Sequence, residues 1–135
     1  MIKLSKEKPY EDACKILGLR PVANYKSYKL TDETRNFIKL ETVAKALNEG
    51  WKPTTIDPKE VRYYVWGWNY TDNRKPAGLL HVYSHLGLGA ADADVGTSLE
   101  FKDRDTAKEF ARMCKPMIVK YLFGRDDHEN FKFDF

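Results

Sequence analysis

The spacing of apolar residues predicts two helices in the first third of the chain. Apolar residues recur every three or four positions over Pro9–Leu17, where proline suits the first turn and Gly18 ends the pattern. The same spacing runs from a Thr31 N-cap to Gly50, with acidic residues in the first turn. Both segments are expected to be amphipathic helices that bury one stripe.

After residue 60 the apolar residues alternate with polar ones, which is the period of a half-buried strand. Val61–Tyr70 and Leu79–Leu88 are predicted as antiparallel partners joined by a turn region. Thr97–Lys102 is predicted as a shorter third strand. Together the three strands would form an antiparallel meander.

A long apolar stripe follows, from an Asp103 N-cap to Gly124, and Pro116 inside it is expected to kink or divide the helix. A short acidic and aromatic segment, residues 125–135, comes last. The expected fold class is α+β, in a single domain of 135 residues. It comprises two N-terminal helices, the three-stranded antiparallel meander, a long C-terminal helix and a short tail or edge strand.

Aromatic residues gather on the first predicted strand, between residues 63 and 70, and strand register decides what they do. In one register Trp66 and Trp68 meet leucine and valine side chains of the second strand and form a core. In the other they join its His and Tyr side chains on an exposed platform. Burying a large aromatic side chain is worth roughly 2–3 kcal/mol, which favours the first register. Tyr63, His81 and Tyr83 would then be the outward-facing rings.

Composition is that of a soluble globular protein, with 42% hydrophobic and 32% charged residues. No apolar run approaches the roughly 20 residues of a membrane helix, and the N-terminus lacks the apolar core of a secretory signal, so a cytoplasmic location is expected. Cys14 and Cys114 lie far apart without a CxxC partner, which favours two buried thiols.

The net charge is +3, with a basic excess before residue 75 and a slight acidic excess after it. This distribution suits a polyanionic partner.

Motifs for catalysis are absent from the sequence, so an enzyme is not expected. The best metal candidates are His81 and His85 with Asp92 and Asp94 in the following loop. On a strand, side chains four positions apart stand about 13 Å from each other, too far to share one ion. No catalytic residue, metal or cofactor is therefore assigned.

Rings interleaved with basic residues on an antiparallel sheet are typical of surfaces that hold single-stranded nucleic acid, because bases stack and Lys or Arg contacts phosphate. The residues predicted to form such a surface are Tyr63, Arg62, Arg74, Lys75, His81, Tyr83 and Lys102.

The last ten residues, DDHENFKFDF, resemble the acidic C-terminal tails of bacterial and phage single-stranded-DNA-binding proteins. The resemblance implies that a replication or host protein could read Asp134 and Phe135 through an apolar pocket rimmed by basic residues. The alternative is an edge strand with Phe131, Phe133 and Phe135 on one face.

Four further segments are similar to a group of small proteins of unassigned function from Bacteroides and their bacteriophages: YEDACKILGL, ALNEGWKP, YYVWGW and VGTSLEFKDRDTAKEF. The similarity implies a phage or prophage source and supplies no catalytic residues. The leading expectation is a protein of phage replication or recombination that binds single-stranded nucleic acid in the host cytoplasm. The alternatives are a module that blocks a host factor through the Tyr63, His81 and Tyr83 face, and a structural component of the virion.

Overall fold

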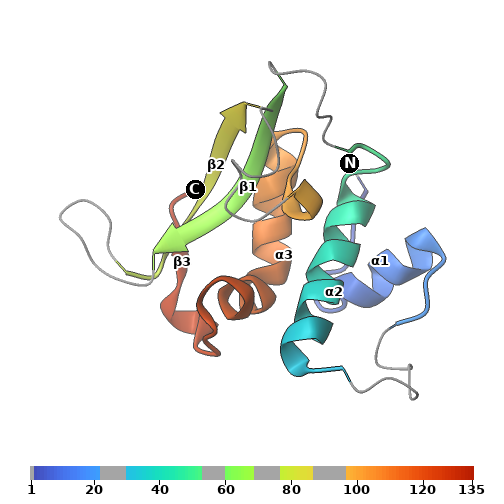
Figure 1. Ribbon diagram of the computed structural model, residues 1–135, viewed down its shortest axis with the longest axis horizontal. Coiled ribbons are helices and arrows are strands. Elements are labelled where there is room, and N and C mark those ends of the chain that lie inside the picture. Colours follow the sequence, from blue (N-terminus) through green and yellow to red (C-terminus); the bar gives the residue numbers. More distant parts are fainter. Residues whose placement is uncertain (1, 22–29, 53–59, 69–76, 87–96) are drawn as a thin grey trace.

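The computed structural model describes residues 2–21, 30–52, 60–68, 77–86 and 97–135 of the chain. The described segments form three α-helices, two short 3-10 helices and three strands (Figure 1). In chain order these are α1 (Pro9–Leu17), α2 (Asp32–Leu47), β1 (Val61–Trp68), β2 (Leu79–Leu86), η3 (Thr97–Leu99), α3 (Arg104–Phe123), η4 (His128–Asn130) and β3 (Lys132–Phe133). The predicted α+β class is confirmed.

The first two helices begin at the residues that the sequence indicates, and α1 ends as expected, whereas α2 ends at Leu47, three residues before the predicted Gly50. Pro9 occupies the first turn of α1, and Gly18 ends this helix in a left-handed conformation (φ 68°). Thr31 caps α2, because its side-chain oxygen accepts a hydrogen bond from the backbone N–H of Thr34 (3.1 Å). The chain leaves α2 through Glu49 and Gly50, both at positive φ.

Helix α3 is capped and kinked as expected. The Asp103 carboxylate accepts a hydrogen bond from the backbone N–H of Thr106 (2.7 Å). Burial alone would raise the pKa of Asp103, but hydrogen bonds from Thr106 outweigh it, so that this pKa is lowered. Cys114 departs from helical geometry (φ −114°, ψ 18°) in the turn before Pro116, whose ring clashes with a straight helix.

The sheet is mixed, in the order β1-β2-β3, and not a purely antiparallel meander. β1 and β2 are antiparallel, with Val65 opposite Val82, whereas β3 runs parallel to β2, with Leu80 opposite Phe133. The predicted third strand was wrong in place and in kind. Its first residues form η3, and Phe101 then exchanges two backbone hydrogen bonds with Tyr63 (2.8 and 3.0 Å) on the outer edge of β1. The other edge of β2 carries β3, which pairs with Leu79 and Leu80.

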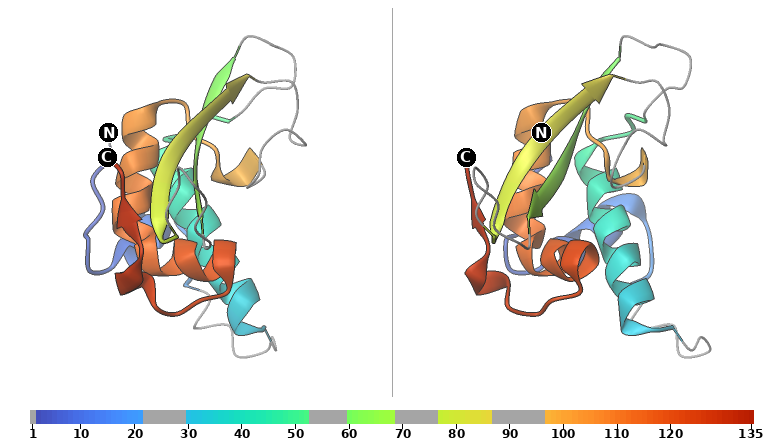
Figure 2. Two further views of the ribbon diagram at one scale, coloured as in Figure 1. Left: turned by 90° about the vertical axis from the view of Figure 1, so that its left-hand side faces the viewer. Right: turned by 60° about the vertical axis from the view of Figure 1, so that its left-hand side comes forward.

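Helices cover one side of the β1–β2 hairpin. α3 packs against that side, α2 packs beside α3, and α1 packs against α2 (Figures 1 and 2). No helix in the described part of the chain is long and apolar enough to cross a membrane.

The main core lies among the three helices and the side of the hairpin that faces α3. Its largest fully buried apolar side chains are those of Leu40, Val43, Leu47, Val82 and Phe101. A smaller cluster joins β2 and α3 to the C-terminal segment, and it consists of Leu80, Val119 and Phe131. The C-terminal segment is therefore part of the folded structure.

Candidate nucleic-acid interface

The strand register places the tryptophans on the side of the hairpin away from α3. Trp66 lies opposite His81 and Trp68 opposite Leu79, and side chains of directly opposed residues share a face. The prediction that the tryptophans anchor the core beneath the helices was wrong. The register found is the one that joins them to the His and Tyr side chains of β2.

The side of the hairpin that faces α3 carries small apolar residues instead of the tryptophans. Val65, Gly67 and Val82 supply that side and are buried. A Cβ at Gly67 would lie 2.5 Å from the backbone oxygen of Leu79, so even one additional carbon has no room. The bulk that the tryptophans were expected to supply comes instead from Phe101 and from α2 and α3.

We call the opposite side of the hairpin the aromatic face. It consists of Tyr64, Trp66, Trp68, His81 and Tyr83. Tyr83 is at its centre, since its ring centroid lies 5.8 Å from that of Tyr64 in a stacked arrangement, and 5.7 Å from Trp68 and 4.7 Å from His81 in edge-on arrangements. Tyr64 is buried, whereas both tryptophans, His81 and Tyr83 remain partly exposed. The face thus presents several rings that already contact one another.

Tyr63 does not belong to the aromatic face. Its side chain lies on the α3 side, where the guanidinium of Arg104 stands 5.1 Å from the ring centroid. Arg104 also donates a hydrogen bond to the backbone oxygen of Val82 (2.7 Å). The structure therefore brings together His81 and Tyr83 of the predicted set, and separates Tyr63 from them.

The predicted basic residues have different environments. The side chain of Arg62 is fully buried and paired with Glu60 and Glu100, so it cannot contact a phosphate without breaking these pairs. Lys102 is exposed just beyond the Tyr63–Phe101 bridge. Arg74 and Lys75 lie outside the described residues.

The C-terminal segment forms the edge strand that was the alternative to a free tail. Phe131 is fully buried, and the rings of Phe133 and Phe135 stack on each other with centroids 4.9 Å apart. Asp134 points to the other side of β3, where its Oδ1 lies 2.6 Å from Nδ1 of His81. Asp134 and Phe135, the residues expected to bind a partner protein, contact this chain itself.

Three cationic side chains of α3 contact these C-terminal rings, and none of them was among the basic residues predicted from the sequence. Lys108 and Arg112 stand 5.6 and 5.3 Å from the Phe135 ring centroid, and Lys115 stands 5.6 Å from that of Phe133. Their spacing of four and three residues puts them on one stripe of a helix, which was a visible signal in the sequence. Trp66 and Trp68 were not predicted for this face, because the other strand register was expected.

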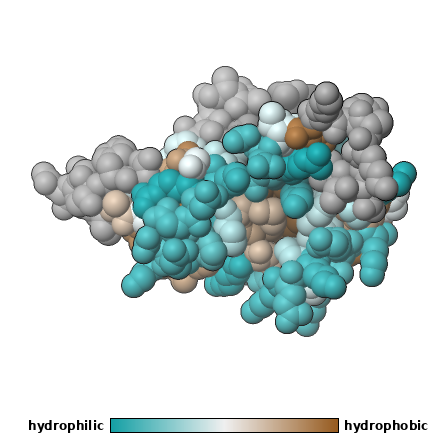
Figure 3. All heavy atoms as spheres, turned by 90° about the horizontal axis from the view of Figure 1, so that it is seen from below, coloured by the Kyte–Doolittle hydropathy of each residue, from teal (hydrophilic) through white to brown (hydrophobic). Residues whose placement is uncertain are grey.

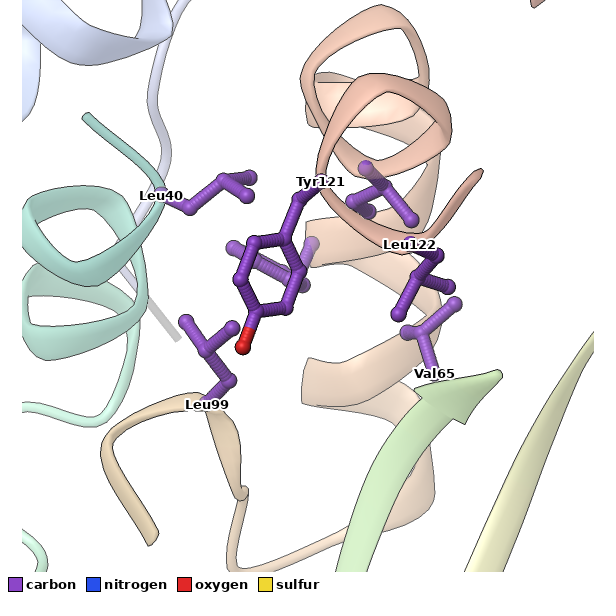
Figure 4. A pocket seen from close by; sticks show the side chains of 7 residues that line it. Leu40, Val65, Leu99, Tyr121 and Leu122 are labelled. Atoms are coloured by element: carbon purple, nitrogen blue, oxygen red, sulfur yellow. The ribbon is translucent and has the colours of Figure 1, made fainter. Parts of the chain in front are cut away.

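The interior offers no room for a ligand at the hollow between α2, α3, η3 and β1. Its volume is about 10 Å³, close to the least that one water needs, and its lining includes Leu40, Val65, Leu99 and Leu122 (Figure 4). Tyr121 also lines it, with its ring pointing across the hollow (Figure 4). A binding site has to be sought on the surface.

Groups that could bind metal or react as nucleophiles are sparse. Among the described residues, no three His, Cys, Asp or Glu side chains gather in a way that could hold a metal ion. Cys14 and Cys114 are free and buried, as predicted, and burial raises the pKa of Cys114 to about 12. A buried thiol with such a pKa is inert.

One side of the molecule is largely hydrophilic where the structure describes it. Seen from below the view of Figure 1, hydrophilic side chains surround a smaller hydrophobic area near the centre (Figure 3). This side presents mainly polar and charged groups to solvent.

Comparison with known proteins does not identify a function, so the function has to be inferred from these surfaces. No protein-family model, no curated protein and no solved structure matches the chain.

Proposed function

We propose that the protein binds single-stranded nucleic acid on the aromatic face. The observation that carries the proposal is the β1–β2 register, which puts Trp66, Trp68, His81 and Tyr83 on the side of the hairpin opposite α3. Helices bury the other side, and on this side Trp66, Trp68, His81 and Tyr83 keep partly exposed rings, although Arg62 and Tyr64 are buried. No catalytic chemistry is required of these residues.

Partly exposed rings on a sheet suit bases better than most other ligands. Stacking of a base on an aromatic side chain is worth about 1–3 kcal/mol and tolerates any base, because every base has a π-face. Side chains two residues apart on a strand are separated by about 6.6 Å. Trp66 and Trp68 can therefore each receive a different base.

Cations at the two edges of the sheet would contact the phosphates. Lys132 is exposed on β3 and, by its pairing with Leu79, belongs to the side of the aromatic face. Lys102 is exposed beside the outer edge of β1. Two such contacts predict a measurable but shallow dependence of affinity on salt.

The test is fluorescence anisotropy of a labelled oligothymidylate at low and at physiological salt. Binding should weaken as salt rises, and Trp66→Ala should reduce affinity by about one base stack, roughly 5- to 150-fold. Tyr121→Ala is the control, since it removes a partly exposed ring of α3 that is not on the aromatic face. It should bind as tightly as the wild type.

Lys132→Gln tests the phosphate contact separately. It should lower the slope of log affinity against log salt by about 0.7 for single strands. Absence of binding at low salt, or equal affinity of wild type and Trp66→Ala when both are folded, contradicts the proposal. Binding that is insensitive to salt and to Lys132→Gln would do so as well.

A further inference from the structure

A groove between α2 and the C-terminal half of α3 has the charge of an anion site. Its volume is about 230 Å³, and it is lined by Asp32, Arg35, Asn36 and Lys39 of α2 and by Met117 and Lys120 of α3. None of these residues belongs to the hairpin. The groove is therefore distinct from the aromatic face.

Three cations of this groove face it from two helices. Arg35 and Lys39 lie one turn apart on α2, which puts them on the same side of the helix, and Lys120 faces them from α3. All three are partly buried, whereas Asp32 is exposed. With one carboxylate against three cations, the lining carries a net charge of +2.

Neighbouring groups neutralise this charge only in part. Arg35 has no ion-pair partner among the residues that the structure describes, and Lys39 stands 5.7 Å from the ring centroid of Tyr10. Lys120 has Asp126 at 3.7 Å, but the Asp126 side chain is 90% exposed, and exposed pairs of this kind are weak. Like charges that converge in a partly buried groove repel one another unless an anion lies between them.

A hydrogen bond between α2 and α3 holds the backbone of the two groove walls together. Asn36 is only 9% exposed, and its Nδ2 donates a hydrogen bond across the two helices to the backbone oxygen of Met117 (2.9 Å). Asn36 thereby fixes the side of α2 that carries Arg35 and Lys39 against α3. A preorganised site binds more tightly, because less side-chain and backbone freedom is lost on binding.

We propose that this groove binds the phosphate group of a small phosphate monoester. Such a group carries a charge of about −1.5 to −2 at neutral pH and three acceptor oxygens, which matches the +2 lining and its three N–H donor groups. A carboxylate, with one charge and two oxygens, would leave part of the cationic lining unpaired. A volume near 230 Å³ leaves space beside the phosphate for the group to which it is attached.

Isothermal titration calorimetry at low salt with three probes tests the site. Inorganic phosphate and a nucleoside 5′-monophosphate should both bind, and the same nucleoside without phosphate should not. Tighter binding of the monophosphate shows that the attached group contributes, whereas equal binding shows that the phosphate alone is recognised. Either result supports the site.

Variants locate the binding in the groove. Arg35→Gln and Lys120→Gln, on different helices, should each weaken phosphate binding at least fivefold. Lys45→Gln is the matched control, because Lys45 is exposed on α2 but does not line the groove. Thermal unfolding checks that each variant is folded. The proposal is overturned if the wild type binds neither phosphate probe at millimolar concentration. It is overturned equally if Lys45→Gln loses as much affinity as the two groove variants.

Discussion

Arg62 and Glu100 form an ion pair inside the protein, with both side chains fully buried and 3.3 Å between Nη1 and Oε1. Arg62 also contacts Glu60 through Nε (3.2 Å), and the backbone oxygen of Glu100 accepts a hydrogen bond from the side chain of Asn48 (2.9 Å). These contacts join β1, the segment before α3 and the C-terminal end of α2. Arg62 therefore stabilises the fold. Its position beside aromatic residues in the sequence had suggested that it binds phosphate.

Arg62→Met is expected to lower the free energy of unfolding by about 3–5 kcal/mol, because it takes the positive charge away from the buried Glu100 carboxylate. Urea denaturation measures this loss. The double variant Arg62→Met with Glu100→Leu should recover much of it, since replacing both charges by apolar groups removes the unpaired charge. A single variant as stable as the wild type would show that the pair is open to water in solution.

Local signals were sufficient to predict the helices, whereas contacts between distant residues decided the rest. Caps, glycines and apolar spacing lie within a few residues of the helix ends they specify, so the bounds of α1 and the start of α2 follow from the sequence. The sheet depends on pairing of Leu80 with Phe133 and of Tyr63 with Phe101, across separations that no local pattern encodes.

For the candidate site, too, local patterns predicted one part and contacts between distant residues decided the rest. Alternation correctly grouped His81 with Tyr83, and Trp66 with Trp68, but the register between the two strands could not be read from it. Counting the burial energy of the tryptophans favoured the wrong register because other side chains, Phe101 among them, fill the core beneath the helices.

Trp66→Ala tests the register through stability. Trp66 is only partly buried, so its loss should cost less than half of the roughly 3–5 kcal/mol that truncation of a fully buried Trp costs. Leu80→Ala, at a fully buried position, should cost about 2–5 kcal/mol. Urea denaturation of both variants makes the comparison, and a larger loss for Trp66→Ala than for Leu80→Ala would contradict the register.

Phe131→Ala tests whether the C-terminal segment belongs to the fold. Phe131 is fully buried and stacks on Phe123 with ring centroids 5.0 Å apart, so its truncation should cost about 3–5 kcal/mol. Phe135→Ala is the comparison, since Phe135 is partly exposed and its cation–π contacts are worth about 1 kcal/mol. Equal, small losses in thermal or urea unfolding would mean that residues 131–135 detach in solution.

Asp127 should contribute a pH-dependent part of the stability. Hydrogen bonds from the side chains of Arg125 and Asn130 hold the pKa of the Asp127 carboxyl well below its usual range. Because the folded-state pKa is the lower one, the contribution is fully present above the unfolded pKa of about 3.9. It is lost as pH falls through the folded value.

Asp127→Asn removes the titrating group, so the free energy of unfolding should fall less steeply between about pH 5 and pH 2 than in the wild type. Urea denaturation at a series of pH values measures both slopes. Asp126→Asn is the control, because it removes the neighbouring carboxylate but leaves the hydrogen bonds among Arg125, Asp127 and Asn130 in place. Parallel pH profiles for wild type and Asp127→Asn would show that these side-chain hydrogen bonds do not persist in solution.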